Sequence, residues 1–248
     1  MSRTAMIFAA GLGTRLKPLT DNQPKALVRY HGVPLLESLI LKLKDSGFDR
    51  IVINVHHFAD MIEDFVRSKD GFGVDVLFSD ERDCLRDTGG GLRHASSLLL
   101  AGDTSSAVLV HNVDIVSNVN LRDFYEKAVS QNALASLLVS RRKSSRHLLF
   151  DETDGNCRLK GWTNVQTGEV KSPFGEISPE DFSHYAFSGV HLVSPKFLAL
   201  MESMPEKFPI MDFYLSLAAD YSIFGVEAPD GCTFLDVGKI GLEGLSSF

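Results

Sequence analysis

The segment MIFAAGLGTRLKPLTDNQPKAL, residues 6–27, decides the fold of this 248-residue chain. Its apolar start at residues 6–9 is typical of a buried strand, and Gly11 and Gly13 follow that strand directly. Glycines at the end of a strand let main-chain N–H groups approach a phosphate. The segment therefore predicts an α/β fold with a phosphate-binding loop after its first strand.

The basic residues of the segment distinguish it from other phosphate loops. Arg15 and Lys25 supply positive charge that main-chain amides cannot. The Gly-Lys-Ser/Thr ending of a P-loop is absent, and Leu16 stands where a dinucleotide fingerprint has its third glycine. Two glycines alone would also fit a plain tight turn, so the longer string carries the assignment.

Short apolar runs and amphipathic helical stripes alternate through the first half of the chain, which is typical of a parallel sheet covered by helices. We expect strands at residues 6–9, 51–55, 74–78, 107–110 and 133–139, and helices at residues 35–43, 58–66, 89–100 and 121–131. Residues 141–186 are polar and rich in turns, and we expect an inserted antiparallel excursion or lid there. Regular patterns return at residues 186–228, so a single domain over residues 1–248 is expected.

Composition limits the classes of partner. The net charge of −7 and the pI near 5.6 argue against a broad nucleic-acid surface. A basic cluster at residues 141–146 fits a solvated loop, with contact to a phosphorylated ligand as the alternative. No apolar stretch of about 18 residues and no signal peptide are evident, so we expect a cytoplasmic protein without membrane contact. The three widely spaced cysteines predict neither a disulfide framework nor a zinc site.

Three further stretches hold candidate site residues. Asp87-Thr88-Gly89-Gly90-Gly91 lies between a strand and a helix and suits either a ligand loop or a simple helix cap. Asp114 follows the strand at residues 107–110, at the sheet edge where α/β proteins bind ligands, and Asp236 ends a late strand. Either aspartate alone also fits a turn or a cap, and the sequence does not show whether the two meet.

The N-terminal string resembles the signature GxGTRLxPLTxxxPKxL of the sugar-1-phosphate nucleotidyltransferase family. It matches that signature at Gly11, Gly13, Thr14, Arg15, Leu16, Pro18, Leu19, Thr20, Pro24, Lys25 and Leu27. The resemblance extends to Asp236 and implies a Rossmann-like, three-layer α/β fold, similar to that of GT-A enzymes, with a mixed, mainly parallel central sheet. It also implies a Mg²⁺-dependent reaction of a nucleoside triphosphate with a sugar 1-phosphate, releasing pyrophosphate.

The resemblance also implies roles for individual residues. Arg15 would neutralise the departing pyrophosphate, and Lys25 would bridge the α-phosphate and the sugar phosphate. The other implied contacts are Ala9, Ala10, Gly11, Gly13, Thr14, Thr88, Gly89 and Asn112 for the nucleotide, Ser188 and Gly189 for the sugar, and Asp114 and Asp236 for Mg²⁺. Two residues depart from the family pattern, Val113 in place of glycine and Phe234 in place of tryptophan, and Val113 predicts a tightened sugar pocket.

The substrate pair is less sharply indicated than the reaction. The Asp-Thr-Gly-Gly-Gly form resembles N-acetylmuramate-1-phosphate uridylyltransferases, which favours UTP with N-acetylmuramic acid 1-phosphate. GTP with mannose or heptose 1-phosphate is the alternative, followed by other hexose 1-phosphates. A catalytically silent nucleotide-sugar-binding subunit and a glycosyltransferase of the same fold remain as other classes, although the latter normally shows Asp-x-Asp where this chain has only Asp114. The sequence leaves a monomer and a homodimer equally open.

Overall fold

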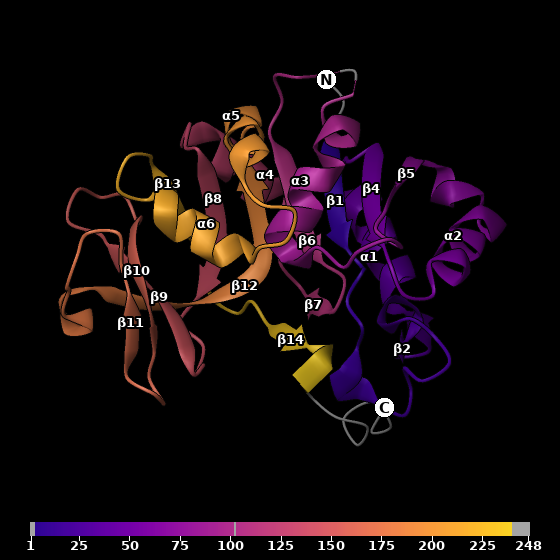
Figure 1. The fold of residues 1–248 in the computed structure, drawn as a ribbon, viewed down its shortest axis with the longest axis horizontal. Coiled ribbons are helices and arrows are strands. Elements are labelled where there is room, and N and C mark those ends of the chain that lie inside the picture. Colours follow the sequence, from indigo (N-terminus) through magenta and orange to yellow (C-terminus); the bar gives the residue numbers. More distant parts are fainter. Residues whose placement is uncertain (1–2, 102, 240–248) are drawn as a thin grey trace.

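A mixed ten-stranded sheet forms the centre of the molecule, which is a computed structural model that describes residues 3–101 and 103–239 (Figure 1). The strands of this sheet are β1 (Thr4–Phe8), β4 (Arg50–Val55), β5 (Asp75–Asp80), β6 (Val108–Asn112), β8 (Ala135–Ser140), β9 (Arg146–Asp151), β10 (Arg158–Asn164), β11 (Glu169–Lys171), β12 (Ser183–Val193) and β13 (Ile223–Glu227). Their order is β11-β10-β13-β8-β12-β6-β1-β4-β5, and β9 pairs with β10 and β12.

Parallel and antiparallel pairings separate into two parts of the sheet. β6, β1, β4 and β5 are parallel neighbours, and β8 pairs in parallel with β13. β12 is antiparallel to both β6 and β8, and β9, β10 and β11 pair only antiparallel. The expected mixed sheet is confirmed, with its parallel pairings concentrated in the N-terminal half.

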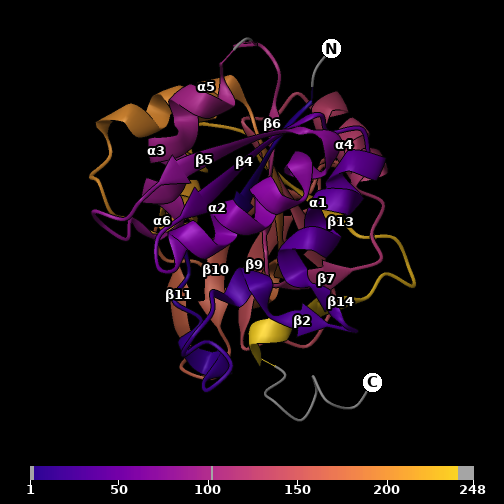
Figure 2. The same cartoon turned by 90° about the vertical axis from the view of Figure 1, so that its right-hand side faces the viewer.

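Helices cover both faces of the sheet, which gives three layers (Figure 2). One face packs against α1 (Leu35–Asp45), α2 (Ala59–Ser68) and α4 (Leu121–Ser130), and the other against α3 (Asp87–Leu99), α5 (Pro195–Leu200) and α6 (Ile210–Leu217). Side chains alternate along β1 accordingly, since Ala5 and Ile7 join the first core and Met6 joins the second. The α/β fold expected from the sequence is confirmed.

Local sequence signals explain where these helices lie. The apolar stripe of α1, from Leu35 to Leu43, is buried in the first core. α4 begins after Asn120, whose side-chain oxygen accepts hydrogen bonds from the amides of Arg122 and Asp123 at 3.0 and 3.3 Å. No helix in the described ranges has the length and apolar character needed to cross a bilayer.

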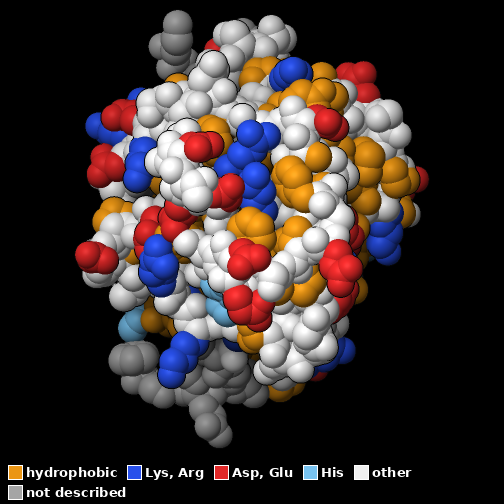
Figure 3. All heavy atoms as spheres, turned by 90° about the vertical axis from the view of Figure 1, so that its left-hand side faces the viewer, with side chains coloured by type: hydrophobic (Ala, Val, Ile, Leu, Met, Phe, Trp, Pro, Cys, Tyr) orange, Lys and Arg blue, Asp and Glu red, His pale blue; other side chains and the backbone are white. Residues whose placement is uncertain are grey.

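The turn-rich region expected at residues 141–186 contains β9, β10 and β11, which extend the central sheet at one side. Figure 3 shows the face of the molecule on this side, where charges of both signs are mixed with apolar groups. Lys171, for example, lies 3.4 Å from Asp212 and over the ring of Trp162. Trp162 thus contacts a lysine on this side. A lid function for the region stays a prediction.

Two small sheets complete the fold. The late strand that ends at Asp236 was expected from the sequence, but the pairings were not. β2 (Arg29–Tyr30) pairs with β3 (Val33–Pro34), and β7 (Ile115–Ser117) pairs with β14 (Phe234–Asp236). The second pairing lies at the carboxyl end of β6 and joins residues that are far apart in the chain. It therefore brings a late segment to the sheet edge where the parallel strands end.

Candidate active site

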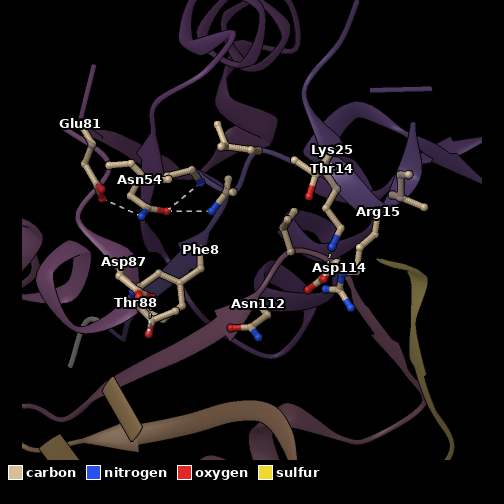
Figure 4. Close-up of a pocket in the computed structure, with 18 of the residues that line it drawn as sticks. Phe8, Thr14, Arg15, Lys25, Asn54, Glu81, Asp87, Thr88, Asn112 and Asp114 are labelled. Atoms are coloured by element: carbon tan, nitrogen blue, oxygen red, sulfur yellow. Dashed lines mark hydrogen bonds and ion pairs between the residues drawn. The ribbon is translucent and has the colours of Figure 1, made fainter. Parts of the chain in front are cut away.

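A cavity of about 510 Å³ lies at the edge of the sheet where β1 and β6 end (Figure 4). It is lined by Phe8, Ala9, Ala10, Gly11, Leu12, Gly13, Thr14, Arg15, Leu16, Lys25, Asn54, Glu81, Leu85, Asp87, Thr88, Asn112, Val113, Asp114 and Lys207. In Figure 4, Arg15, Lys25 and Asp114 lie together at one end of the cavity. Asp87 and Thr88 lie at the other end, with Asn112 between the two groups.

The start of the glycine loop is held by a buried side-chain network. The Asn54 Oδ1 atom accepts hydrogen bonds from the amides of Ala9 at 2.7 Å and Ala10 at 3.3 Å. The Asn54 amide group donates to Glu81 Oε1 at 2.7 Å, as Figure 4 shows. The Ala9 and Ala10 amides thus have a protein partner. Phosphate contacts of this loop are therefore left to the exposed residues from Gly11 onward.

Glu81 is fully buried, and both of its carboxylate oxygens are engaged. Oε2 accepts a hydrogen bond from the Arg86 amide at 3.2 Å, while Oε1 pairs with Asn54. A Cβ atom on Gly91 would lie 2.8 Å from Oε1, so glycine leaves room for the carboxylate. Because buried polar groups are costly without partners, this network rigidly positions the glycine loop against α3.

Gly13 turns the loop toward its basic residue. Its φ of 64° lies in the left-handed region, and a Cβ atom there would lie 2.9 Å from Thr20 Cγ2. The Thr20 hydroxyl donates to the Gly13 carbonyl at 2.9 Å. A short 3₁₀ turn, Thr14–Leu16, follows and leaves Arg15 exposed at the cavity. The loop is thereby closed on itself while its charged side chain stays accessible.

Lys25 and Asp114 form an ion pair at the end of the cavity where Arg15 lies. Their side chains are only 11% and 15% exposed, so the two charges are largely shielded from water. Lys25 begins a 3₁₀ turn, Lys25–Leu27, and Asp114 follows β6. The structure therefore brings together a predicted catalytic residue and a predicted metal ligand that are distant in sequence.

Asp236 joins this group through the pairing of β14 with β7. Asp236 is opposite Ile115 in that ladder, and the Val237 amide donates to the Asp114 carbonyl at 2.9 Å. The Asp236 Oδ1 atom is buried without a hydrogen-bond partner among the described residues. Its Oδ2 atom lies 3.4 Å from Lys239 Nζ. The two predicted metal ligands are thus neighbours.

Gly238 explains how the charged groups approach one another. A Cβ atom at this position would lie 3.1 Å from Asp236 Oδ1 and 3.2 Å from Arg15 Nη2, and it would also crowd the Lys25 ammonium. A side chain at residue 238 would therefore push the charged groups apart. Arg15, Lys25 and Asp236 surround this glycine, although only the first two line the cavity.

The two aspartates fit a Mg²⁺ ion by the chemistry of their donors. Mg²⁺ prefers oxygen ligands and is usually held by one or two carboxylates together with phosphate oxygens and water. The unpartnered Asp236 oxygen beside Asp114 matches that requirement. Larger groups suited to an all-protein metal site, with three or more His, Cys, Asp or Glu residues, are not found within residues 3–101 and 103–239.

At the other end of the cavity, the three glycines at residues 89–91 serve packing. The Gly89 amide donates to the Phe208 carbonyl at 2.9 Å, and a Cβ atom on Gly89 would collide with the Phe208 ring. A Cβ atom on Gly90 would collide with the Glu206 carbonyl. Gly89 itself does not line the cavity, so its predicted contact with the base rests on the family resemblance alone.

The segment before α6 contributes to the same end of the cavity. The Ile210 amide donates to the Thr88 hydroxyl at 3.0 Å, and Lys207 lines the cavity. Asp87 has a φ of 60°, which is uncommon outside glycine, and its Oδ1 accepts from the Thr88 amide at 2.6 Å. Thr88 is thus oriented by two neighbours beside a carboxylate and an ammonium group.

The predicted sugar residues lie on β12, where its pairing with β8 is interrupted. The register shifts between Phe187 and His191, and Gly189 has a φ of 72°. A Cβ atom on Gly189 would lie 2.8 Å from Ile115 Cγ1 and 3.1 Å from Asn112 Nδ2. Ser188 is fully buried, with its hydroxyl 3.5 Å from that of Ser140. Gly189 therefore adjoins the cavity residue Asn112, whereas the Ser188 side chain points into the protein.

Comparison with known proteins identifies the family. A family model described as "Nucleotidyl transferase" matches residues 4–148. The chain belongs to this nucleotidyl transferase family. It is similar to the N-acetylmuramate alpha-1-phosphate uridylyltransferase of Caulobacter vibrioides, with 33% identity over 92% of this chain and 89% of that protein. The assignment to the sugar-1-phosphate nucleotidyltransferases is confirmed.

Further relatives of this nucleotidyltransferase differ in their named substrates. The mannose-1-phosphate guanyltransferase of Yarrowia lipolytica is 25% identical over 94% of this chain, which spans 60% of that protein. A solved UDP-glucose pyrophosphorylase in complex with UDP-glucose has a TM-score of 0.76 and 16% identity, covering 99% of this chain and 96% of its own. The corresponding protein of Acinetobacter baumanii has a TM-score of 0.74 and 18% identity, covering 96% and 89%. These structures support the fold.

Val113 stands where the family pattern has glycine, and it lines the nucleotidyltransferase cavity from the edge of the core. Its side chain is 5% exposed and belongs to the core on the α1 side of the sheet. The Val113 amide donates to the Phe8 carbonyl at 3.2 Å, which fixes the backbone beside β1. The added bulk is thus taken up largely by the core, which weakens the expectation of a tightened sugar pocket.

Several residues of the site carry no signal in the sequence. Asn54 and Glu81 follow the ordinary pattern of strand ends, and Lys207 lies in a loop far from the glycine string. Their positions at the carboxyl ends of parallel strands are the one signal that could have marked Asn54 and Glu81 as candidates. Gly238 could have been noted because it ends the late Asp-x-Gly motif.

Proposed function

We propose that this nucleotidyltransferase transfers a uridylyl group from UTP to N-acetylmuramic acid 1-phosphate and releases pyrophosphate in the cytoplasm. The observation that carries the proposal is the group of Arg15, Lys25 and Asp236 around Gly238, together with Asp114, which pairs with Lys25. Arg15, Lys25 and Asp114 line one end of a cavity of about 510 Å³, and Asp236 adjoins that end beside Gly238. The choice of uracil and muramic acid is supported by the Caulobacter vibrioides relative.

The reaction requires positioning and charge neutralisation rather than proton transfer. A phosphate oxygen of the sugar 1-phosphate attacks the α-phosphorus of UTP in line, and the bond to the β-phosphate oxygen breaks. Negative charge then accumulates on the departing pyrophosphate, where exposed Arg15 is available to neutralise it. Lys25 stabilises the same transition state when its ammonium group leaves the ion pair with Asp114 and contacts the substrate phosphates instead.

Asp114 and Asp236 are the residues that would hold Mg²⁺. The bound ion supplies positive charge for the phosphates. Asp114 also neutralises Lys25, so the ammonium group keeps a partner in the shielded end of the cavity. Asn54 holds the Ala9 and Ala10 amides and thereby fixes where the loop places the triphosphate.

GTP with mannose 1-phosphate is a second candidate because of the polar groups at the base end. Asp87 lines the cavity there, and a carboxylate can accept both hydrogen bonds from the N1–H and N2–H edge of guanine. The Yarrowia lipolytica relative is a guanyltransferase by name. Uracil has a single N–H donor between two carbonyl groups. Asp87 would accept from the N–H group, and Lys207 or Thr88 would donate to a carbonyl.

Pyrophosphate release distinguishes these candidates. UTP, GTP, dTTP, CTP and ATP are each combined with the 1-phosphates of N-acetylmuramic acid, N-acetylglucosamine, glucose, mannose and heptose, with Mg²⁺ or with a chelator. We expect the fastest release from UTP with N-acetylmuramic acid 1-phosphate, and none with the chelator. Asp114→Asn is the control for contaminating activity. Fastest turnover with another pair would overturn the substrate assignment, and release unaffected by the chelator would overturn the metal assignment.

A further inference from the structure

Two adjacent arginines after β8 have opposite surroundings. The Arg141 guanidinium is bound by protein groups, with Glu227 Oε1 at 2.9 Å from its Nε and the Tyr185 hydroxyl beside its Nη2. Arg142 Nη2 donates to the Phe187 carbonyl at 2.7 Å. Its Nε is buried without a hydrogen-bond partner among the described residues. Only Arg141 therefore has its charge compensated by a direct carboxylate contact.

The charge on Arg142 is costly in this position. Burial lowers the pKa of Arg142, and the Asp236 carboxylate opposes that shift. An arginine stays protonated in proteins and has five N–H donors to satisfy. A half-buried guanidinium bound to one neutral carbonyl therefore favours an anion that can accept the remaining hydrogen bonds.

The position of Arg142 points toward the sugar substrate. Phe187, which accepts its hydrogen bond, directly precedes the bulge at Ser188 and Gly189. Asp236, the carboxylate that acts on its pKa, adjoins Asp114 through β14 and β7. Arg142 thus lies on the β12 side, at the bulge that contains Gly189, whereas Arg15 and Lys25 belong to the glycine-loop segment.

A second unsatisfied group lies beside Arg142. His147 is hydrogen-bonded to the Arg142 backbone, and its Nδ1 atom is buried without a partner in the described part of the chain. Burial, His184 and the charge of Arg142 lower the pKa of His147. The neutral ring therefore adds no competing positive charge beside Arg142.

We propose that Arg142 binds an anionic group of the sugar substrate through its guanidinium, which lies beside Phe187 at the start of the β12 bulge. The inference rests on the proposed function, because it assumes that a sugar 1-phosphate enters between β12 and the carboxylate pair. The shared chemistry is an oxyanion, which is the 1-phosphate in every sugar substrate and also a carboxylate in an acidic sugar. Bidentate hydrogen bonds from arginine suit both groups.

The test compares Arg142→Ala, Arg142→Lys and the matched control Arg141→Lys in the full chain. KM is measured for UTP, N-acetylmuramic acid 1-phosphate and N-acetylglucosamine 1-phosphate, which lacks the carboxylate. Loss of a charge-assisted hydrogen bond should raise the KM for the sugar phosphate about 10- to 100-fold in Arg142→Ala. The lysine variant should recover part of the loss, and Arg141→Lys should leave every KM unchanged.

Each outcome bears on the proposal. A rise for both sugars identifies the 1-phosphate as the bound group, and a rise for the acidic sugar alone identifies the carboxylate. Unchanged values for both sugars, or an equal rise in the KM for UTP, would overturn the role of Arg142. If the wild-type protein releases no pyrophosphate, the proposed function fails first. Calorimetric binding of the two sugar phosphates to the wild type and Arg142→Ala then tests the inference without turnover, and equal affinities would overturn it.

Discussion

The glycine-loop side and the β12 side of the candidate site differ in how many of their polar groups have hydrogen-bond partners in the protein. On the nucleotide side, Asn54 and Glu81 bind one another and the loop amides in a closed network. On the sugar side, Arg142 and Asp236 each keep a buried polar atom without a partner among the described residues. A satisfied network is rigid and preorganised, whereas unsatisfied groups gain their partners from a ligand. Under the proposed function, the nucleotide end is therefore built in advance, and the sugar and metal ends are completed by the ligands that bind.

The largest expected effect comes from the sugar and metal side. Asp236→Asn removes a charge without changing shape, and because Oδ1 has no hydrogen-bond partner within residues 3–101 and 103–239, the fold should be unaffected. We expect kcat to fall about 10²- to 10³-fold, as for other groups that stabilise transition-state charge. Pyrophosphate release titrated with Mg²⁺ measures the loss, with Asp212→Asn as a carboxylate control outside the cavity. Unchanged turnover would remove Asp236 from the metal site.

Breaking the nucleotide-side network should affect nucleotide binding alone. Asn54→Ala frees the Ala9 and Ala10 amides and leaves one oxygen of buried Glu81 unpaired. Unpaired buried groups cost about 1–3 kcal/mol, so the KM for the nucleoside triphosphate should rise about 10- to 100-fold. Steady-state kinetics with Asn164→Ala as the control checks this. An equal rise in the KM for the sugar phosphate would contradict the claim that the Asn54 network acts on nucleotide binding alone.

The glycines at residues 89–91 test whether the base end is built by packing. Gly90→Ala places a methyl group against the Glu206 carbonyl, so we expect a loss of about 1–3 kcal/mol in the free energy of unfolding. Urea unfolding measures this loss, and Ser97→Ala in the same helix is the control. A stable variant with weakened nucleotide binding would instead favour direct contact between this glycine and the base.

Acid should weaken the packing of β6 against β12 gradually, by a small amount for each histidine and each pH unit. His111 on β6 and His191 on β12 are fully buried, and burial lowers their pKa values to about 4 and about 3. The unfolded chain binds protons near pH 6.5, so the free energy of unfolding should fall as pH drops from about 6.5 toward 4. Each histidine contributes at most about 1.4 kcal/mol per pH unit.

Urea unfolding between pH 4 and 8 checks this dependence. His191→Gln, which keeps a polar group near Tyr214, should flatten the pH profile, whereas exposed His57→Gln should not. A profile that is equally steep in all three proteins would assign the acid sensitivity to other groups.

Periodicity and motif spacing were enough to predict the sheet, the main helices and the glycine loop. The strand expected at residues 51–55 is β4, Arg50–Val55, and the helix expected at residues 121–131 is α4, Leu121–Ser130. These elements bury regular apolar patterns, and such patterns are visible in a single sequence.

Long-range pairings were not predictable in the same way. β7 and β14 contain three residues each, which is too short for a periodic signal, so the meeting of Asp114 and Asp236 followed only from family resemblance. The sequence left residues 87–91 open as a ligand loop or a helix cap, because the packing partner of the glycines, residues 206–208, is distant in sequence. Arg141 contacts the carboxylate of Glu227, whereas Arg142 Nε has no partner in the described residues. This difference could not be predicted, because Glu227 is distant in sequence.

The pairing of β14 with β7 also sets the order in which the protein becomes active during synthesis. Arg15 and Lys25 leave the ribosome early, but Asp236 is made near the end of the described chain. At about 5–20 residues per second, roughly 10 to 45 s separate Arg15 from Asp236. A nascent chain can therefore form the loop network around Asn54 well before its second carboxylate exists. Nucleotide binding should accordingly precede catalysis in the life of each molecule.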